Sequence, residues 1–394
     1  MLGSKEAQDK ILEFNYKVRK GSIDLLDSLG LVLSRDIIAG SDIPFSNRFR
    51  VEGFAVRAID IKGADRSYPV RLKIAKQAPA RDTVLEPGFC IPVRAGDPVP
   101  EGSDCVVGKD TAETGQKDVL VYQECEPGRN VVCRGQDIKK GQAAFSCGHK
   151  IEASHVGLLA WLGFKQVEVF LPPRLAILGI NRKGVDVQDS PGLTVGSLSR
   201  AMGIESRLQQ AVYGEDNLQK AIDSSLSEND ALIITGDGTV GEYGFINDLM
   251  SGAGTELIFW KVNQQPGKNL AFVSRQEKPV FCMGGSIPSL LICFRYYVYP
   301  FLARAMGRTD IGGPVVQARA LQKVVHRRGR TDFMLVRADR QKGYVFSPAC
   351  TDRQGLFDCL RDAAGMVSMA EDTGDIMAGD TIEVMLFSKN EKTV

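Results

Sequence analysis

The chain has 394 residues, and at about 150 residues per domain this length predicts two to four domains, not one core. Hydrophobic residues make up 43% and charged residues 25%, values of ordinary folded proteins that exclude a disordered chain. Lys and Arg number 49 against 48 Asp and Glu, so the formal charge of +1 provides no global attraction to nucleic acid or to a membrane surface. Any charged site must therefore be local.

Export and membrane insertion are not indicated either. The stretch Met1 to Lys20 is polar and mixed in charge, unlike a secretory signal. The longest apolar stretch, 287–301, carries Arg295 in its middle and is shorter than the roughly 18 residues that a spanning helix needs. The nine cysteines form no C-x-x-C pair, which argues against zinc. We predict a cytoplasmic protein with no membrane and no nucleic-acid partner.

The first part of the chain alternates between helical and β-like patterns. Residues 5–38 read as helices that lead into a short strand, and helical character returns at 153–162. Between them, short β-like runs are separated by Gly, Pro and Asp turns. We therefore predict a discontinuous N-terminal domain at 1–43 and 137–170, interrupted by a β-rich insert domain at 44–136.

Further along, strands interleave with helices. The apolar runs 175–180 and 231–235 flank helical segments, a pattern that predicts βαβ units and a mostly parallel sheet in an α/β domain at 171–308. Residues 309–394 read as a small β domain, since Ile382, Val384 and Leu386 alternate as in a half-buried strand. The predicted class is multidomain α/β plus β.

The run ALIITGDGTVGEYG at 231–244 carries the strongest chemical signal. A buried strand enters a glycine-rich turn and then a helix, and in a parallel sheet this turn lies at the carboxyl edge, where backbone N–H groups favour an anion. A phosphate or carboxylate could bind there. The alternative is that Gly236, Gly238 and Gly241 serve only a tight turn.

Three other segments combine charge with a turn. In FWKVNQQPGK at 259–268, Lys261 and Lys268 flank a Pro-Gly turn and could neutralise a pyrophosphate or molybdate, although a solvated loop explains them equally well. Segments 51–56 and 93–102 each place a carboxylate beside a glycine turn, where a cap or turn former is the simpler interpretation.

Taken together and in order, these segments resemble one family, the molybdopterin molybdotransferases, which include bacterial MoeA and the E domain of gephyrin. The resemblance extends from about residue 20 to the C-terminus. The matching stretches are PFSNRFRVEGFAV (44–56), RAGDPVPEGSDCVV (94–107), GRNVVCRGQDI (128–138), ILGINRKG (177–184), ITGDGTVGEYG (234–244), FWKVNQQPGKN (259–269), MGGSIPS (283–289) and the C-terminal segment 355–387.

The resemblance implies a dimeric subunit of four parts: a discontinuous N-terminal domain, a β-rich insert, a three-layer α/β molybdopterin-binding domain and a C-terminal β-barrel. It implies insertion of molybdate into adenylated molybdopterin with release of AMP and the help of Mg²⁺. It also implies a pterin site in a cleft between subunits. Other molybdenum cofactor biosynthesis proteins or molybdoenzymes become candidate partners.

The resemblance also carries roles onto matching residues. Glu52, Asp137, Glu242 and Lys268 become the catalytic candidates, with Asp137 and Glu242 as metal ligands. Glu52 is the less secure assignment, because the loop at 45–52 is one residue longer than the family pattern. The candidates for binding pterin, phosphate or molybdate are Gly236, Asp237, Gly238, Thr239, Gly241, Lys261, Gly267, Gly284, Gly285, Ser286, Arg182 and Lys183.

Several positions depart from the family pattern. Arg182 and Lys183 stand where the family has an Asp-Glu pair, and Gly244 replaces an Asp. The remaining departures are Ala95, Gln265, Gly284 and Ile287. Two hypotheses follow: an active but divergent molybdotransferase, or an impaired relative that binds, carries or scaffolds the cofactor. A nucleotide-binding regulator that uses the same glycine loop is a third.

Overall fold

The computed structural model describes residues 1–80, 82–181, 189–214, 218–236, 240, 242–341, 343–349 and 355–387. The chain divides into two compact units. The larger unit contains Met1–Ile23, Gly30–Ser34 and Glu168–Val394, and the smaller unit contains Asp24–Leu29 and Arg35–Val167. The finer division into four domains stays a prediction.

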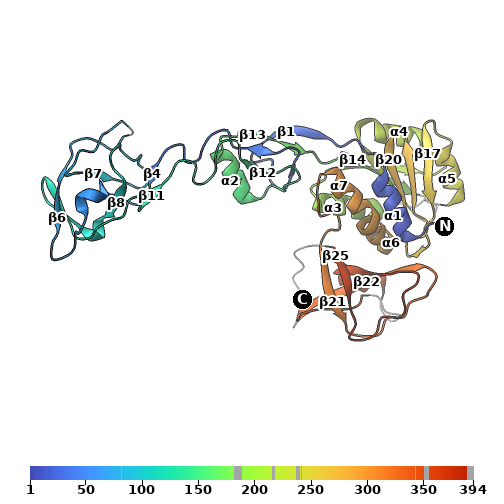
Figure 1. Cartoon of the computed structure of the whole chain (residues 1–394). Coiled ribbons are helices and arrows are strands. Elements are labelled where there is room, and N and C mark those ends of the chain that lie inside the picture. The colour runs from blue at the N-terminus through green and yellow to red at the C-terminus, as the bar shows by residue number, and fades with distance from the viewer. Residues whose placement is uncertain are drawn as a thin grey trace. The chain divides into compact units, whose positions relative to one another are not determined.

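The smaller unit is built mainly from short strands, as the texture of its sequence predicts (Figure 1). Its main sheet has six strands in the order β8-β5-β7-β6-β10-β9. The helix α2 begins after Glu152, whose side chain accepts from the backbone N–H of His155 while the His155 ring accepts from the backbone of Glu152. The elements are β3 (Ile37–Ile38), β4 (Arg48–Phe49), β5 (Gly53–Val56), β6 (Val70–Ile74), β7 (Phe89–Val93), β8 (Cys105–Gly108), β9 (Ala112–Thr114), β10 (Asp118–Val121), β11 (Val131–Val132), β12 (Ala143–Phe145), α2 (Ala153–Trp161) and the 3-10 turns η1 (Ala58–Ile61) and η2 (Lys109–Thr111).

The larger unit contains a six-stranded sheet in the order β15-β14-β16-β20-β19-β17. The first four of these strands are mutually parallel, which confirms the predicted βαβ pattern, whereas β19 and β17 run antiparallel at one side. The strands are β14 (Leu175–Asn181), β15 (Ser206–Val212), β16 (Ala231–Gly236), β17 (Thr255–Trp260), β19 (Ala271–Arg275) and β20 (Lys278–Gly284), and the short β1 (Lys20–Asp24), β2 (Val32–Leu33) and β13 (Gln166–Phe170) form a separate sheet.

Helices cover both faces of this sheet (Figure 1). Because successive side chains of a strand point to opposite faces, Leu175 and Ile177 pack with α1, α3, α6 and α7, while Ala176 and Leu178 pack with α4 and α5. The helices are α1 (Ser4–Glu13), α3 (Ser190–Ala201), α4 (Leu218–Glu228), α5 (Tyr243–Met250), α6 (Ile287–Cys293) and α7 (Tyr299–Ala305), with a π-helical turn, Phe294–Val298, between the last two. The predicted three-layer α/β domain is confirmed.

The C-terminal strands form the predicted closed β-barrel. They are ordered β22-β23-β21-β25-β24, and an additional pairing of β24 with β22 completes the ring. Val384 and Leu386 of β25 point into its core, as their alternation predicts. The elements are β21 (Val315–Ala320), β22 (Thr331–Gln341), β23 (Gly343–Pro348), α8 (Leu356–Arg361), β24 (Gly365–Met369) and β25 (Thr381–Leu386), with the short β18 (Gln264–Gln265) added beside β22. Within the described ranges, no helix is both long enough and apolar enough to cross a membrane.

Candidate functional site

Three parallel strands of the larger unit end at one level. Gly236, the last residue of β16, is in register with Ile180 of β14 on one side and with Gly284 of β20 on the other. The structure therefore brings together two glycines that lie far apart in the sequence. Gly285 and Ser286 follow directly and lead into α6. This carboxyl edge is where open α/β sheets bind ligands.

The two paired glycines have different reasons to be glycine. A Cβ atom on Gly236 would lie 2.5 Å from the carbonyl oxygen of Ile180 and 2.7 Å from Cγ2 of Val240, so close packing of the strand ends excludes a side chain. A Cβ atom on Gly284 would meet no atom of the described chain within 4 Å. Space above Gly284 is thus open to a ligand.

Two buried polar groups at this edge were not predicted from the sequence. Thr235, in register with Gly179, is fully buried, and Asp189 is 4% exposed. One carboxylate oxygen of Asp189 accepts from the backbone N–H of Gly192 at 2.8 Å, while Oδ2 lies over Gly179. Neither Oδ2 nor the Thr235 hydroxyl has a hydrogen-bond partner within the described part of the chain. Buried polar groups normally find partners, so both are available to a ligand or to water.

In the sequence, ordinary structural roles explain both Asp189 and Thr235. Asp189 precedes Ser190 and Pro191 at the start of α3, a pattern typical of a helix N-cap, and it does cap that helix. Thr235 stands inside an apolar strand, where a β-branched residue needs no further explanation. The available signal was the presence of two oxygen-bearing side chains within a few residues of predicted strand ends.

The turn flanked by Lys261 and Lys268 and the helix α5 both belong to the larger unit, where Tyr243 and Trp260 bring them close. Glu242 directly precedes α5, and the Tyr243 ring lies 5.9 Å from that of Trp260. The Nζ atom of Lys261 lies 4.2 Å above the Trp260 ring. Lys268 is exposed, and its carbonyl accepts from the backbone of Val262. Tyr243, which follows Glu242, and the cation of Lys261 thus both lie beside the Trp260 ring.

Gly267 has a structural role in this turn. Its φ is +87°, and a Cβ atom there would lie 2.5 Å from Cys293 Sγ and 2.8 Å from Nε2 of Gln264. A contact between Gly267 and a cofactor stays a prediction.

The pKa of Tyr213 is raised by nearby acidic residues, including Glu242. Its hydroxyl donates to Oδ2 of Asp248 at 2.6 Å. This hydrogen bond, burial and the negative charges of Asp248 and Glu242 raise the pKa of Tyr213 to about 12. The phenol therefore remains a neutral donor at physiological pH.

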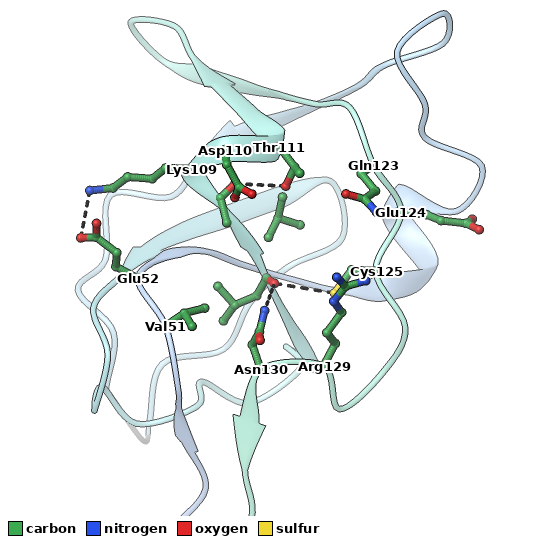
Figure 2. Close-up of a pocket in the computed structure, with 13 residues that line it drawn as sticks. Val51, Glu52, Lys109, Asp110, Thr111, Gln123, Glu124, Cys125, Arg129 and Asn130 are labelled. Atoms are coloured by element: carbon green, nitrogen blue, oxygen red, sulfur yellow. Dashed lines mark hydrogen bonds and ion pairs between the residues drawn. The ribbon is translucent and has the colours of Figure 1, made fainter.

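Glu52 lies in the smaller unit at the rim of a pocket of about 420 Å³ (Figure 2). Its carboxylate pairs with Nζ of Lys109 at 3.0 Å, and both side chains are 62% exposed. Gly53 follows it in β5, and a Cβ atom there would lie 2.1 Å from the carbonyl oxygen of Val107. The glycine beside Glu52 is therefore required by strand packing, and the acid itself is free to exchange partners.

Asp137 is placed separately in the same unit. Its Oδ2 lies 3.8 Å from Nη2 of Arg48, and it does not line the pocket of Glu52. No group of three or more His, Cys, Asp or Glu side chains gathers in metal-binding geometry anywhere in the described ranges. The predicted metal ligands Asp137 and Glu242 belong to different units.

The remaining predicted residues lie outside the described ranges. These are Arg182, Lys183, Asp237, Gly238, Thr239 and Gly241. Their roles stay predictions from the resemblance.

Two family models match most of the chain. Residues 2–163 match the MoeA N-terminal region (domain I and II), and residues 179–304 match the probable molybdopterin binding domain. Among curated relatives, a molybdopterin molybdenumtransferase of Staphylococcus epidermidis is 24% identical over 98% of this chain and 96% of its own length. A putative molybdopterin biosynthesis protein of Methanocaldococcus jannaschii is 27% identical over 97% and 95%.

Solved structures show the same fold. Two structures of a MoeA molybdopterin biosynthesis protein from Pyrococcus horikoshii match with TM-scores of 0.82 and 0.77 at 24% and 23% identity. Both matches cover 98% of this chain, and they cover 99% and 100% of the respective structures. With its N-terminal region, molybdopterin-binding domain and fold all matched along nearly its whole length, the chain belongs to the MoeA family.

Proposed function

We propose that the chain acts in molybdenum cofactor biosynthesis, where it inserts molybdate into adenylated molybdopterin and releases AMP. The observation that carries this proposal is the carboxyl edge of the sheet, where Gly236 and Gly284 are in register. Two buried polar atoms at this edge, Oδ2 of Asp189 and the hydroxyl of Thr235, have no hydrogen-bond partner among the described residues. Support also comes from relatives that match nearly end to end and are named molybdopterin molybdenumtransferase.

The edge offers groups suited to a pterin that bears a phosphate. Oδ2 of Asp189 can accept from ring N–H or amino donors, and the Thr235 hydroxyl can donate or accept. Open space at Gly284 lets a ligand approach the backbone closely. Lys261 and Lys268 of the same unit supply positive charge for molybdate or for the phosphate that leaves with AMP.

A requirement for Mg²⁺ belongs to the proposal as a prediction. Mg²⁺ prefers oxygen ligands, but within the described ranges the carboxylate of Asp137 faces Arg48, and no other acid joins Glu242 in a metal-binding group. The described residues therefore do not form such a site by themselves. Comparing AMP release with and without a chelator tests the requirement.

The decisive experiment incubates the purified protein with adenylated molybdopterin and a series of molybdate concentrations, and measures bound pterin and released AMP together. We expect AMP release that depends on molybdate. Pterin binding without release would reject the transferase activity, and absence of binding would reject the site as well.

A matched pair of variants locates the site. Asp189→Asn keeps an oxygen for the N–H of Gly192 but places an amino group where Oδ2 was, so we expect weaker pterin binding with an unchanged helix cap. Thr194→Val is the control, because it removes an exposed hydroxyl of the same helix that bonds only the backbone of Ser190. Equal pterin affinity of Asp189→Asn and the unmodified protein would exclude Asp189 from the site.

The impaired-relative hypothesis rests on Arg182 and Lys183, which reverse the charge of a family acid pair, and on Gly244, which replaces a family acid. Among the described residues, a Cβ atom at Gly244 would meet only the Tyr213 hydroxyl, at 3.8 Å, so a Cβ atom fits without moving the described backbone. If the chain binds pterin without turnover, Gly244→Asp combined with Arg182→Asp and Lys183→Glu should restore AMP release. A nucleotide-binding regulator would instead bind AMP or ATP in the absence of pterin.

The proposal also covers the oligomeric state, the cellular location and the partners of the chain. The family resemblance predicts a homodimer and contacts with other cofactor biosynthesis proteins or molybdoenzyme clients, and the sequence itself predicts a cytoplasmic location. Sedimentation equilibrium of the full chain tests the first of these, and a monomer at micromolar concentration would reject it.

A further inference from the structure

The pocket that holds Glu52 also contains a chemical group unused by the proposed reaction. Cys125 lines this pocket together with Arg129 and Asn130 (Figure 2). Its side chain is largely buried, with the residue 8% exposed, and it reaches solvent through the pocket. A thiol at a pocket wall is accessible to small molecules while remaining shielded from proteins.

A second thiol lies against the first. Cys105, the first residue of β8, is fully buried and packs in the same apolar cluster as Cys125. The Cys105 thiol lies 4.0 Å from the carbonyl oxygen of Val56. Cys125 Sγ also lies 3.6 Å from the carbonyl oxygen of Val106, the residue that follows Cys105.

Backbone hydrogen bonds fix this proximity. The N–H of Gly128 donates to the carbonyl of Asp104 at 2.7 Å, and the N–H of Val106 donates to the carbonyl of Arg129 at 3.4 Å. The Asn130 side chain donates to the carbonyl of Val106 as well. These bonds hold the segment that carries Cys125 along the start of β8, which carries Cys105.

The environment distinguishes the roles of the two sulfurs. Interaction with the Cys105 thiol, followed by the positive charge of Arg129, lowers the pKa of Cys125 despite its burial. Interaction with Cys125 and burial raise the pKa of Cys105. A thiolate that faces a pocket beside a second thiol is the usual arrangement of a peroxide-sensitive cysteine and its resolving partner.

We propose that Cys125 and Cys105 form an oxidative modification site, in which a small hydroperoxide entering the Glu52 pocket converts the two thiols into a disulfide. The Cys125 thiolate attacks the peroxide, forming an S–O bond as the O–O bond breaks, and the departing oxygen takes up the proton that Cys125 lost and leaves as water, or as an alcohol from an organic hydroperoxide. The Cys105 sulfur then attacks Cys125, forming the S–S bond and releasing the second water with its own proton. Two thiols lose two electrons, and the peroxide gains them.

The test treats the full-length protein with hydrogen peroxide, blocks remaining thiols with iodoacetamide and maps disulfides by mass spectrometry. We expect a Cys105–Cys125 linked peptide, the loss of two titratable thiols per chain, and recovery of both after reduction with dithiothreitol. Oxidation confined to the exposed Cys133 and Cys147, with the pair intact, would overturn the proposal. Conversion of Cys125 to sulfinic acid without a disulfide would overturn the role of Cys105.

Variants separate the two steps. In Cys105→Ser, the sulfenic acid on Cys125 should persist and be captured by dimedone, whereas Cys125→Ser should abolish both the adduct and the disulfide. Cys90→Ser is the matched control, because Cys90 is fully buried in the same cluster and burial raises its pKa to about 12. The mapping on the unmodified protein stands by itself if a variant does not fold. This site is independent of the proposed transferase activity.

Discussion

Gly236 and Gly284 are neighbours in register on adjacent strands, yet replacing each with alanine should have opposite consequences. In Gly236→Ala, the new methyl carbon would lie 2.5 Å from the carbonyl oxygen of Ile180, although ordinary contacts begin at 3.4 Å. It would also lie 2.7 Å from Cγ2 of Val240. The ends of β14 and β16 must therefore separate by several tenths of an ångström. Overpacking of this kind typically costs about 1–3 kcal/mol.

Gly284→Ala provides the matched control for stability and a separate test of function. Its methyl group would meet no atom of the described residues within 4 Å, so we expect a change in unfolding free energy of no more than about 0.5 kcal/mol. If a ligand approaches the backbone at Gly284, the same methyl group should lower pterin affinity. The expected pattern is thus lost stability at Gly236 and lost binding with retained stability at Gly284.

Urea unfolding followed by circular dichroism gives the stabilities, and fluorescence titration with molybdopterin gives the affinities. The reasoning about strand packing is refuted if Gly236→Ala unfolds at the same urea concentration as the unmodified protein. The reasoning about ligand access is refuted if Gly284→Ala binds pterin with unchanged affinity.

Three further predictions concern other parts of the molecule. Gly53→Ala should destabilise the smaller unit by about 1–3 kcal/mol, because its Cβ atom would lie 2.1 Å from the backbone oxygen of Val107; an unchanged urea midpoint would contradict this. Burial opposes ionisation of Asp230, but its hydrogen bonds and ion pair with Arg174 prevail and lower its pKa. The unfolded chain then binds more protons near pH 4, so the stability from this carboxylate is complete above about pH 4 and is lost as pH falls through the folded pKa. Asp230→Asn should flatten that acid limb in urea midpoints taken between pH 3 and 6, and identical slopes would count against the ion pair. Lys268→Ala should slow AMP release at least about tenfold with an unchanged melting temperature, since this lysine is exposed; equal rates would remove it from the site.

Several elements of the fold could be predicted from the sequence because local patterns determine local structure. Uninterrupted apolar runs at 175–180 and 231–235 predicted buried parallel strands, and β14 and β16 occupy them. Alternation of Ile382, Val384 and Leu386 predicted a strand with one buried face, which became β25 of the barrel. The ordered motifs predicted the family, and the comparisons agree.

The site was predicted less completely. The motifs identified Gly236 and Gly284 but not that the two residues pair across adjacent strands, and they gave no reason why one is crowded and the other open. The carboxylates Glu52 and Asp137, which the resemblance grouped as catalytic, take separate cationic partners within their unit.

Sequence by itself therefore determined the βαβ pattern and the strands at 175–180, 231–235 and 381–387, because helix and strand periodicities act over a few neighbouring residues. The expectation of helices across 5–38 was wrong beyond α1, because β1 and β2 form there instead. Tertiary structure alone decided which of these residues meet. Oδ2 of Asp189 and the hydroxyl of Thr235 come to lie buried, without partners among the described residues, where β14 and β16 pair in register beneath α3. Cys105 and Cys125 share one apolar cluster because the segment 125–129 is hydrogen-bonded to the start of β8. Such pairings depend on register and strand order, which no local pattern encodes.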